Sequence, residues 1–203
     1  MLTLYTAPGS CSRASHIALE ESGLQFDVHL VDFAKAEQRQ PDFLAINPKG
    51  RVPALATDHG VLTESPAILA YIAALAPPGL LAPVDPFDFA RMQAFNLYLA
   101  STVHVAHAHG RRASRWSDDA DAQASMAAKV TQNMRDGFTL IEADLTDEWA
   151  MGDRYTVADP YLFTFAGWLE TDGVDIAEFP KVQAHFERMQ QRPAVIRALA
   201  AET

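Results

Sequence analysis

A proline-rich segment constrains the fold of this chain more than any other feature. It reads Ala76-Pro77-Pro78-Gly79-Leu80-Leu81-Ala82-Pro83-Val84-Asp85-Pro86. Four prolines and a glycine this close together cannot continue a helix or a central strand. We therefore interpret residues 77–86 as a linker, and we expect one domain over residues 1–76 and a second over residues 87–203.

The residues before the linker alternate between strand and helix signals. Strands are predicted where apolar and polar residues alternate or short apolar runs end at turn residues, and helices where apolar residues recur every three or four positions. In chain order these patterns predict a strand at 2–5, a helix at 12–21 ended by Gly23, a strand at 26–30, a hairpin at 54–63 and a helix from 66 to 75. Together they indicate a small mixed sheet covered by helices, an α/β domain.

The residues after the linker show only helical periodicity. Apolar residues recur at three- and four-residue spacing in five stretches, at 87–109, 119–145, 157–169, 179–190 and 193–201. Within them, Thr156-Val157-Ala158-Asp159 has the pattern of a capping box, in which Asp159 reaches back to the backbone of Thr156. We expect an all-helical second domain, and a structural role for Asp159.

Composition limits the partners and the compartment. The chain has 203 residues, a net charge of −10 and 49% hydrophobic residues, which indicates a folded protein whose main partner is neither nucleic acid nor an anionic membrane. A single cysteine cannot form an intramolecular disulfide, which fits a reducing compartment. The chain shows no secretory signal and no run of about 20 apolar residues, so we expect a soluble cytoplasmic protein.

The only cysteine, Cys11, lies in the turn Ala7-Pro8-Gly9-Ser10-Cys11-Ser12-Arg13, between the first predicted strand and helix. A helix N-terminus carries a partial positive charge and unpaired N–H groups, which favour ionisation of a thiol held there. Arg13 adds a full positive charge nearby. A small, buried and inert side chain is the interpretation that this turn favours by itself, and the motifs described below strengthen the alternative of a reactive thiol.

A second informative stretch is Asn47-Pro48-Lys49-Gly50-Arg51-Val52-Pro53-Ala54-Leu55. Pro53 directly precedes a predicted strand, where its missing N–H is tolerated. A cis bond before Pro53 would leave the N–H and C=O of Val52 free to pair with a peptide-like ligand. The alternative is an ordinary loop.

Thr63-Glu64-Ser65-Pro66 ends a predicted strand and opens a helix. N–H groups at a helix N-terminus can hold a carboxylate, and Glu64 can hold an ammonium group. Together Glu64 and Ser65 suit the two charged ends of an amino-acid head group. A plain helix cap at Ser65 is the alternative.

Two other stretches leave their roles open. The basic segment Gly110-Arg111-Arg112-Ala113-Ser114-Arg115-Trp116 either lines a pocket that favours anions or is a solvated helix end. His104, His107 and His109 make a metal site conceivable. Only His104 and His107 share a helix face, however, and no thiol or carboxylate completes a set, so we expect no metal.

These motifs, in this order, resemble those of the glutathione S-transferases. The resemblance covers nearly the whole chain, and Pro8-Gly9-Ser10-Cys11-Ser12 with Phe43-Leu44-Ala45-Ile46-Asn47-Pro48-Lys49-Gly50 is most similar to the bacterial, cysteine-containing beta class. It implies a thioredoxin-like N-terminal domain with Pro53 as its cis-proline and a helical-bundle C-terminal domain. It also implies a homodimer with a glutathione site in each subunit.

The resemblance also assigns roles to residues. Cys11 would lie beside the glutathione sulfur, with Ser10 and His104 as further catalytic donors. The glutathione ligands would be Lys35, Val52, Pro53, Glu64, Ser65 and His104. One departure concerns the helix before His104, where the asparagine expected in the family is replaced by Leu97 and Asn96 stands one position earlier, facing a different direction.

We weigh three functions. The first is conjugation of glutathione, as co-substrate, to small and mostly apolar electrophiles, a detoxification activity in which the site lowers the thiol pKa of glutathione. The second is a glutathione-dependent thiol–disulfide reductase in which Cys11 itself reacts. The third is a non-catalytic binding module with a transferase-like fold. Cys11, Val52, Pro53, Glu64 and Ser65 occur together, which weighs against the third.

Overall fold

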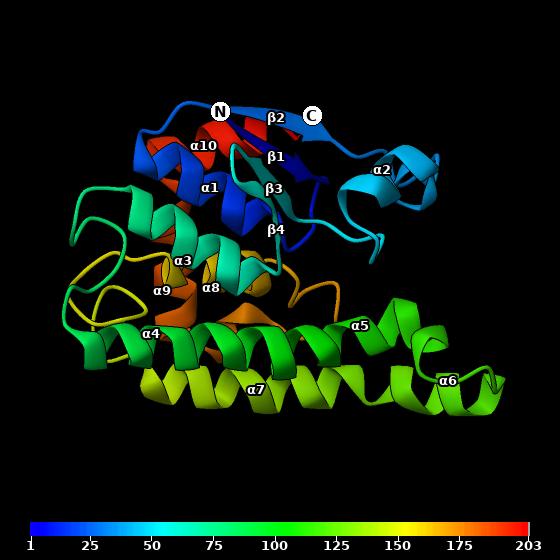
Figure 1. Ribbon diagram of the computed structural model, residues 1–203. Coiled ribbons are helices and arrows are strands. Elements are labelled where there is room, and N and C mark those ends of the chain that lie inside the picture. The colour runs from blue at the N-terminus through cyan, green and yellow to red at the C-terminus, as the bar shows by residue number, and fades with distance from the viewer. Residues whose placement is uncertain (203) are drawn as a thin grey trace.

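The first domain is built on a four-stranded mixed sheet (Figure 1), described here from a computed structural model in which residues 1–202 are placed. The strands are β1 (Leu2–Thr6), β2 (Phe26–Leu30), β3 (Ala54–Thr57) and β4 (Gly60–Thr63), in the order β2-β1-β3-β4. β1 pairs parallel with β2 and antiparallel with β3, and β3 and β4 form the predicted hairpin.

Three α-helices and one 3₁₀ turn complete this domain: α1 (Arg13–Ser22), the 3₁₀ turn Glu37–Arg39, α2 (Pro41–Ile46) and α3 (Ser65–Leu75). α1 ends because Gly23, at φ +70°, adopts the left-handed conformation that glycine reaches without steric cost. The predicted strands and helices occur in the predicted order, α2 is an additional helix that the sequence did not predict, and the thioredoxin-like α/β class is confirmed.

The second domain is helical, also as predicted. Its elements are α4 (Pro86–Tyr98), a π-helical segment (Leu99–Val103), α5 (His104–Arg112), a 3₁₀ turn (Ala113–Arg115), α6 (Ala120–Ala128), α7 (Val130–Asp144), α8 (Ala158–Ala166), a 3₁₀ turn (Ile176–Glu178), α9 (Pro180–Gln190) and α10 (Pro193–Ala200). The single helix predicted over 119–145 is wrong, because the chain breaks at Lys129 between α6 and α7. Within residues 1–202, no helix has the length and apolarity to span a membrane.

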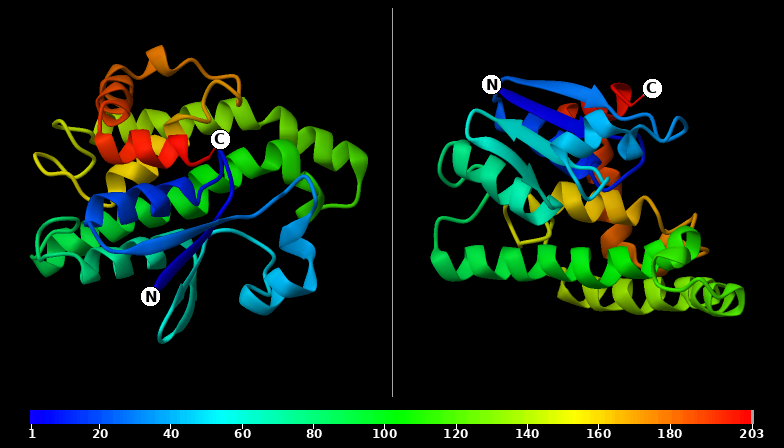
Figure 2. Two further views of the ribbon diagram at one scale, coloured as in Figure 1. Left: turned by 90° about the horizontal axis from the view of Figure 1, so that it is seen from above. Right: turned by 45° about the vertical axis from the view of Figure 1, so that its right-hand side comes forward.

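The two domains share a core because α1 packs on both sides. One side contacts α3, and the other contacts α8 and α10. Figure 2 shows α10, from the far end of the chain, lying beside α1. Ile17 of α1 is fully buried in a cluster with Phe163, Met189 and Val195 of the second domain. Ion pairs at the rim of this contact join Arg13 to Glu202, Arg192 to Glu21 and Arg197 to Glu20.

The capping box at α8 forms as predicted and extends further. Asp159 accepts the backbone N–H of Thr156 at 2.6 Å, and the N–H of Ala158 donates to the Thr156 hydroxyl at 3.2 Å. The same carboxylate accepts the N–H of Ala150 and contacts Nε2 of His185 at 2.9 Å. Asp159 is fully buried, so it ties α8, α9 and the preceding loop together.

Candidate functional site

The turn that carries Cys11 is held by a network of short side chains. The Ser12 hydroxyl bonds Oγ1 of Thr6 at 2.6 Å and accepts the N–H of Ala7 at 3.1 Å. Ser10 donates to the carbonyl of Ala7 at 2.8 Å and bonds the Ser12 hydroxyl. Ser12 is therefore used within the turn and does not cap α1, which begins one residue later than predicted.

The second domain clamps the same turn from outside. Nε1 of Trp168 donates to the carbonyl of Gly9 at 3.0 Å. Glu202 accepts the N–H of Gly9 at 3.0 Å and pairs with Arg13 through two bonds of 2.9 and 2.6 Å. The charge of Arg13 is thus neutralised by Glu202 and does not act on Cys11.

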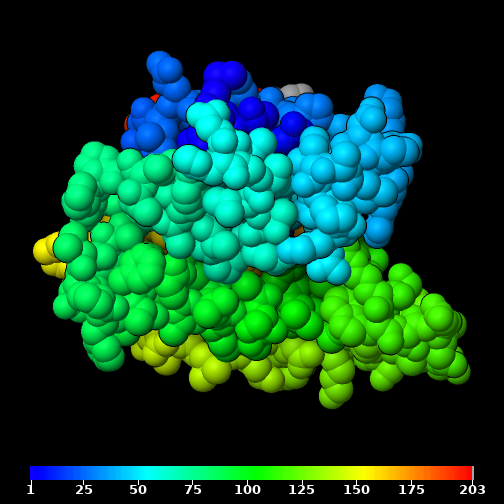
Figure 3. Space-filling model, in the orientation of Figure 1, coloured from blue at the N-terminus to red at the C-terminus, as the bar shows by residue number. Residues whose placement is uncertain are grey.

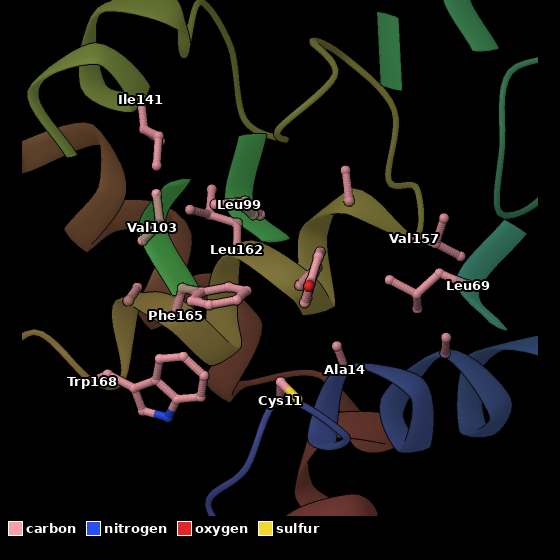
Figure 4. Close-up of a cluster of buried hydrophobic side chains, with 14 of the residues drawn as sticks. Cys11, Ala14, Leu69, Leu99, Val103, Ile141, Val157, Leu162, Phe165 and Trp168 are labelled. Carbon is pink, nitrogen blue, oxygen red and sulfur yellow. The ribbon is translucent and has the colours of Figure 1, made fainter. Parts of the chain in front are cut away.

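Cys11 lies between the domains, on the side of α1 that faces Phe165 and Trp168 (Figure 4). Its side chain is buried, and Sγ donates to the carbonyl of Val52 at 3.6 Å. Burial raises the pKa of the thiol, against smaller lowering effects from the Ser65 hydroxyl and the charge of Arg112. The expectation of an easily ionised Cys11 is therefore wrong, because desolvation outweighs the helix N-terminus.

The peptide bond between Val52 and Pro53 is cis, which confirms that part of the resemblance. The N–H of Val52 makes no hydrogen bond with any residue in 1–202, and its carbonyl accepts only the weak S–H donor of Cys11. An extended peptide can therefore pair with this backbone beside the thiol.

Glu64 and Ser65 stand at the start of α3. Glu64 occupies the cap position at φ +70° and ψ +118°, a conformation that a non-glycine residue adopts only when its surroundings impose it. Its carboxylate is exposed and pairs with Lys49 at 2.6 Å. Ser65 is buried as the first helical residue and makes no capping bond, so the alternative of a plain cap at Ser65 is wrong.

His104 begins α5, directly after the π-helical segment, a distortion that often marks functional sites. Its ring lies against Phe165 and Trp168, at centroid distances of 5.5 and 5.3 Å. Burial, followed by the positive charges of His107, Arg112, Arg115 and Arg51, lowers the pKa of His104 to about 4. The imidazole is therefore neutral at pH 7 and has one N–H to donate.

Two cavities meet at Cys11, and both are lined by Cys11, Arg51, His104 and Arg115. The first, which we call the loop cavity, has a volume of about 200 Å³ and is also lined by Ser10, Val52 and Trp168. The second, the α3 cavity, has about 170 Å³ and is lined by Pro53, Glu64 and Ser65. Three larger hollows, of about 490, 430 and 360 Å³, touch neither Cys11 nor His104.

Comparison with known proteins identifies this arrangement. Residues 1–74 match the family model of the glutathione S-transferase N-terminal domain, and residues 97–193 match that of the C-terminal domain. Glutathione S-transferase GstA of Escherichia coli O157:H7 is 35% identical, over 99% of this chain and 98% of that protein. This chain belongs to the glutathione S-transferase family.

Solved structures agree with that assignment. A glutathione transferase homolog from Sulfitobacter, with bound glutathione, is 45% identical and superposes with a TM-score of 0.96, covering 99% of this chain and 98% of that one. The bacterial beta-class enzyme of Sphingomonas chungbukensis is 37% identical with a TM-score of 0.85, covering 98% of each chain. The predicted family, with its beta-class affinity, is confirmed, and the protein is a transferase.

The transferase brings most of the predicted site residues together. Ser10, Cys11, Val52 and His104 line the loop cavity, and Cys11, Pro53, Glu64, Ser65 and His104 line the α3 cavity. Lys35 lines neither cavity; it is exposed and pairs with Asp32 at 2.9 Å. No group of three potential metal ligands occurs in the part of the chain that the structure describes.

In the helix before His104, Asn96 is buried and Leu97 is 56% exposed, so the two face different directions as expected. The side-chain amide of Asn96 has no hydrogen-bond partner among the described residues. Asn96 lines neither cavity at Cys11.

Sequence reasoning missed several residues of the site. Arg39, His107 and Trp168 line the loop cavity, and Nδ1 of His107 bonds Asp172 at 2.7 Å. The basic segment did contain a usable signal: Arg112 and Arg115 line the loop cavity, whereas Arg111 is exposed and lines a separate hollow. No sequence pattern around Trp168 indicates a role in the site. Trp168 follows Cys11 by 157 positions in the chain, and only folding brings the two together.

Proposed function

We propose that this transferase joins the thiolate of glutathione to small electrophilic compounds, as a cytoplasmic homodimer that serves detoxification. The observation that carries the proposal is the free backbone edge at Val52, with its cis bond to Pro53, directly beside Cys11. Glutathione is a peptide-like molecule, and its cysteinyl part can pair with that edge as an added strand.

The charged ends of glutathione fit the neighbouring groups. The γ-glutamyl end carries an ammonium group and a carboxylate, which match the exposed carboxylate of Glu64 and the start of α3 at Ser65. Lys35 is exposed on the segment that precedes the 3₁₀ turn, where it can reach the other end of the tripeptide. Its pair with Asp32 is at the surface, so exchanging that partner costs little.

The reaction needs a thiolate, and the site supplies hydrogen-bond donors for one. The thiol of glutathione loses its proton to solvent. The resulting thiolate accepts a hydrogen bond from the N–H of His104 and, once they turn away from the carbonyls of Val52 and Ala7, from the neutral Cys11 thiol and the Ser10 hydroxyl. The sulfur then attacks an electrophilic carbon, a C–S bond forms, and the leaving group departs with its electron pair.

No observation favours the other two functions. A reductase needs a reactive Cys11 thiolate, yet burial raises the pKa of Cys11 and the sequence has no second cysteine. A module that does not bind glutathione has no need of the Val52 edge together with Glu64 and Ser65.

The test is calorimetric binding of glutathione to the unmodified protein and to Glu64→Ala, with conjugation followed on 1-chloro-2,4-dinitrobenzene. Loss of a charged hydrogen bond should weaken binding by about 1.5–3 kcal/mol. Glu187→Ala, which removes an exposed carboxylate far from both cavities, is the matched control and should bind normally. No glutathione binding by the unmodified protein would refute the proposal.

A further inference from the structure

Four arginines surround the loop cavity without any carboxylate to pair with. Arg39, Arg51, Arg112 and Arg115 line it, and within residues 1–202 none of their guanidinium groups makes an ion pair or a hydrogen bond. Seven of the other eight arginines have a partner: Arg13, Arg91, Arg135, Arg154, Arg188, Arg192 and Arg197. In a chain with net charge −10, four of the five arginines without a partner are thus gathered at one site.

The four side chains come from both domains. Arg39 ends the 3₁₀ turn Glu37–Arg39 and lies across Gly50, where a Cβ atom would stand 3.3 Å from its guanidinium nitrogen. Arg112 ends α5, and Arg115 follows one turn later. The charges of Arg112, Arg51 and Arg39, after burial, lower the pKa of Arg115, which shows that the four are close enough to repel. Such a cluster favours the binding of anions.

Glutathione alone does not balance this charge. Its γ-glutamyl carboxylate and ammonium group cancel each other and belong, in the function proposed above, to the α3 cavity. The thiolate brings one negative charge to the loop cavity, and the glycyl carboxylate, which Lys35 can also hold, brings at most one more, against four guanidinium groups. At least two positive charges therefore remain for the other substrate.

Another part of the wall of the loop cavity is aromatic. Trp168 stacks on His107, with ring centroids 4.2 Å apart and an interplanar angle of 20°, and His104 lies 5.3 Å from Trp168 on another side. A flat apolar body can lie against these rings while a carboxylate reaches a guanidinium group, which binds carboxylates through two parallel hydrogen bonds.

We propose that the electrophile of this transferase is an anion, an aromatic or unsaturated compound that bears a carboxylate held by Arg112 and Arg115. This inference rests on the proposed function and replaces the expected mostly apolar substrate with an amphiphilic one. Arg112 and Arg115 are chosen because they stand on the helical domain, across the cavity from the Val52 edge.

The test compares two electrophiles that differ only in charge, 4-chloro-3-nitrobenzoate and its methyl ester. In both, glutathione sulfur displaces chloride, which leaves with the electron pair of the C–Cl bond. Each kcat/KM is divided by the rate constant of the uncatalysed reaction with glutathione, so that the intrinsic reactivity of the ring cancels. We expect the normalised value to be at least about tenfold higher for the acid than for the ester.

Substitutions of single arginines then show which side chains favour the acid over the ester. Arg112→Gln and Arg115→Gln should each lower kcat/KM for the acid by about tenfold or more and for the ester by much less. Arg111→Gln removes a neighbouring exposed arginine outside the loop cavity and should change neither value. Added salt should slow the acid more than the ester.

Two results would overturn the inference while the proposed function stands: equal normalised rates for acid and ester, or equal losses for both in the Arg112 and Arg115 variants. If glutathione binds but neither compound reacts, calorimetry measures the binding of the acid to protein saturated with S-methylglutathione. No binding in that experiment refutes the inference. Failure to bind glutathione at all would instead refute the proposed function.

Discussion

At the scale of single residues, Cys11 shows two opposing influences on one thiol. The start of α1 favours a thiolate, but the side chain is buried and its pKa is raised. A neutral thiol is a hydrogen-bond donor and a poor nucleophile. The geometry of Cys11 therefore fits a hydrogen-bond donor to the sulfur of glutathione better than a group that reacts itself.

Replacing Cys11 by alanine should accordingly leave conjugation largely intact. Ser10 and His104 remain as donors, and the S–H group is a weak donor, so losing its bond to the thiolate should cost about 1.5 kcal/mol, the low end for a bond to a charged group, and lower kcat/KM by about tenfold. Cys11→Ser keeps a donor and serves as the control. Steady-state kinetics at saturating glutathione measure both, and a loss of several orders of magnitude in Cys11→Ala would show that the thiol itself reacts.

His104 should make the protein less stable in mild acid. Its pKa is about 4 when folded and about 6.5 when unfolded, so the unfolded state binds the proton first as the pH falls. This stabilising contribution is complete above pH 6.5 and declines toward pH 4, by about 2 kcal/mol between pH 7 and pH 5. Urea unfolding at both pH values should show a smaller decline in His104→Gln. An equal decline in the two proteins would contradict the assigned pKa.

At the scale of secondary-structure elements, the sequence predicts correctly those features that are determined by interactions between near neighbours in the chain. Gly23, the hairpin at 58–60 and the Thr156–Asp159 box each act within a few residues of themselves. The break at Lys129 was missed because apolar spacing continues through it. Trp168, Glu202 and Arg39 reach the site only through tertiary packing, so no local sequence pattern predicts their place there.

Asp159 should be a major stabilising residue of the helical domain. Asp159→Ala removes a fully buried carboxylate and leaves His185 and the N–H groups of Ala150 and Thr156 without their acceptor, which should cost about 3–5 kcal/mol of unfolding free energy. Asp175→Ala, which removes a cap from an exposed 3₁₀ turn, is the control at about 0.5–2 kcal/mol. Urea denaturation compares the two, and equal losses would refute this role.

At the scale of the whole molecule, three elements from both domains that lie on one face contain exposed apolar side chains. β4, α3 and α4 lie on the face seen in Figure 3, where the two domains meet along a seam. Val61 of β4, Leu75 of α3, and Phe87 and Leu97 of α4 are between 43% and 72% exposed. β4 is also an unpaired edge strand. Exposed apolar groups and a free edge are typical of an interface.

We expect this face to join two copies of the chain. Leu97→Glu places a charge in the proposed interface and should shift the protein from dimer to monomer, because an unpaired charge is costly to bury. Ile196→Glu is the control, since Ile196 is equally exposed (54% against 56%) but belongs to α10, beside α1. Light scattering at micromolar concentration measures the mass, and a monomeric unmodified protein would contradict the expectation.

The double-sided packing of α1 has a consequence for the protein while it is being made. α1 and α10 start about 180 residues apart in the sequence. At a translation rate of about 5–20 residues per second, α1 emerges from the ribosome about 10–35 s before the helix that covers it. For most of that interval, until Phe163 of α8 has been made, Ile17 has no partner from the second domain, so the nascent first domain exposes an apolar surface on which chaperones can act.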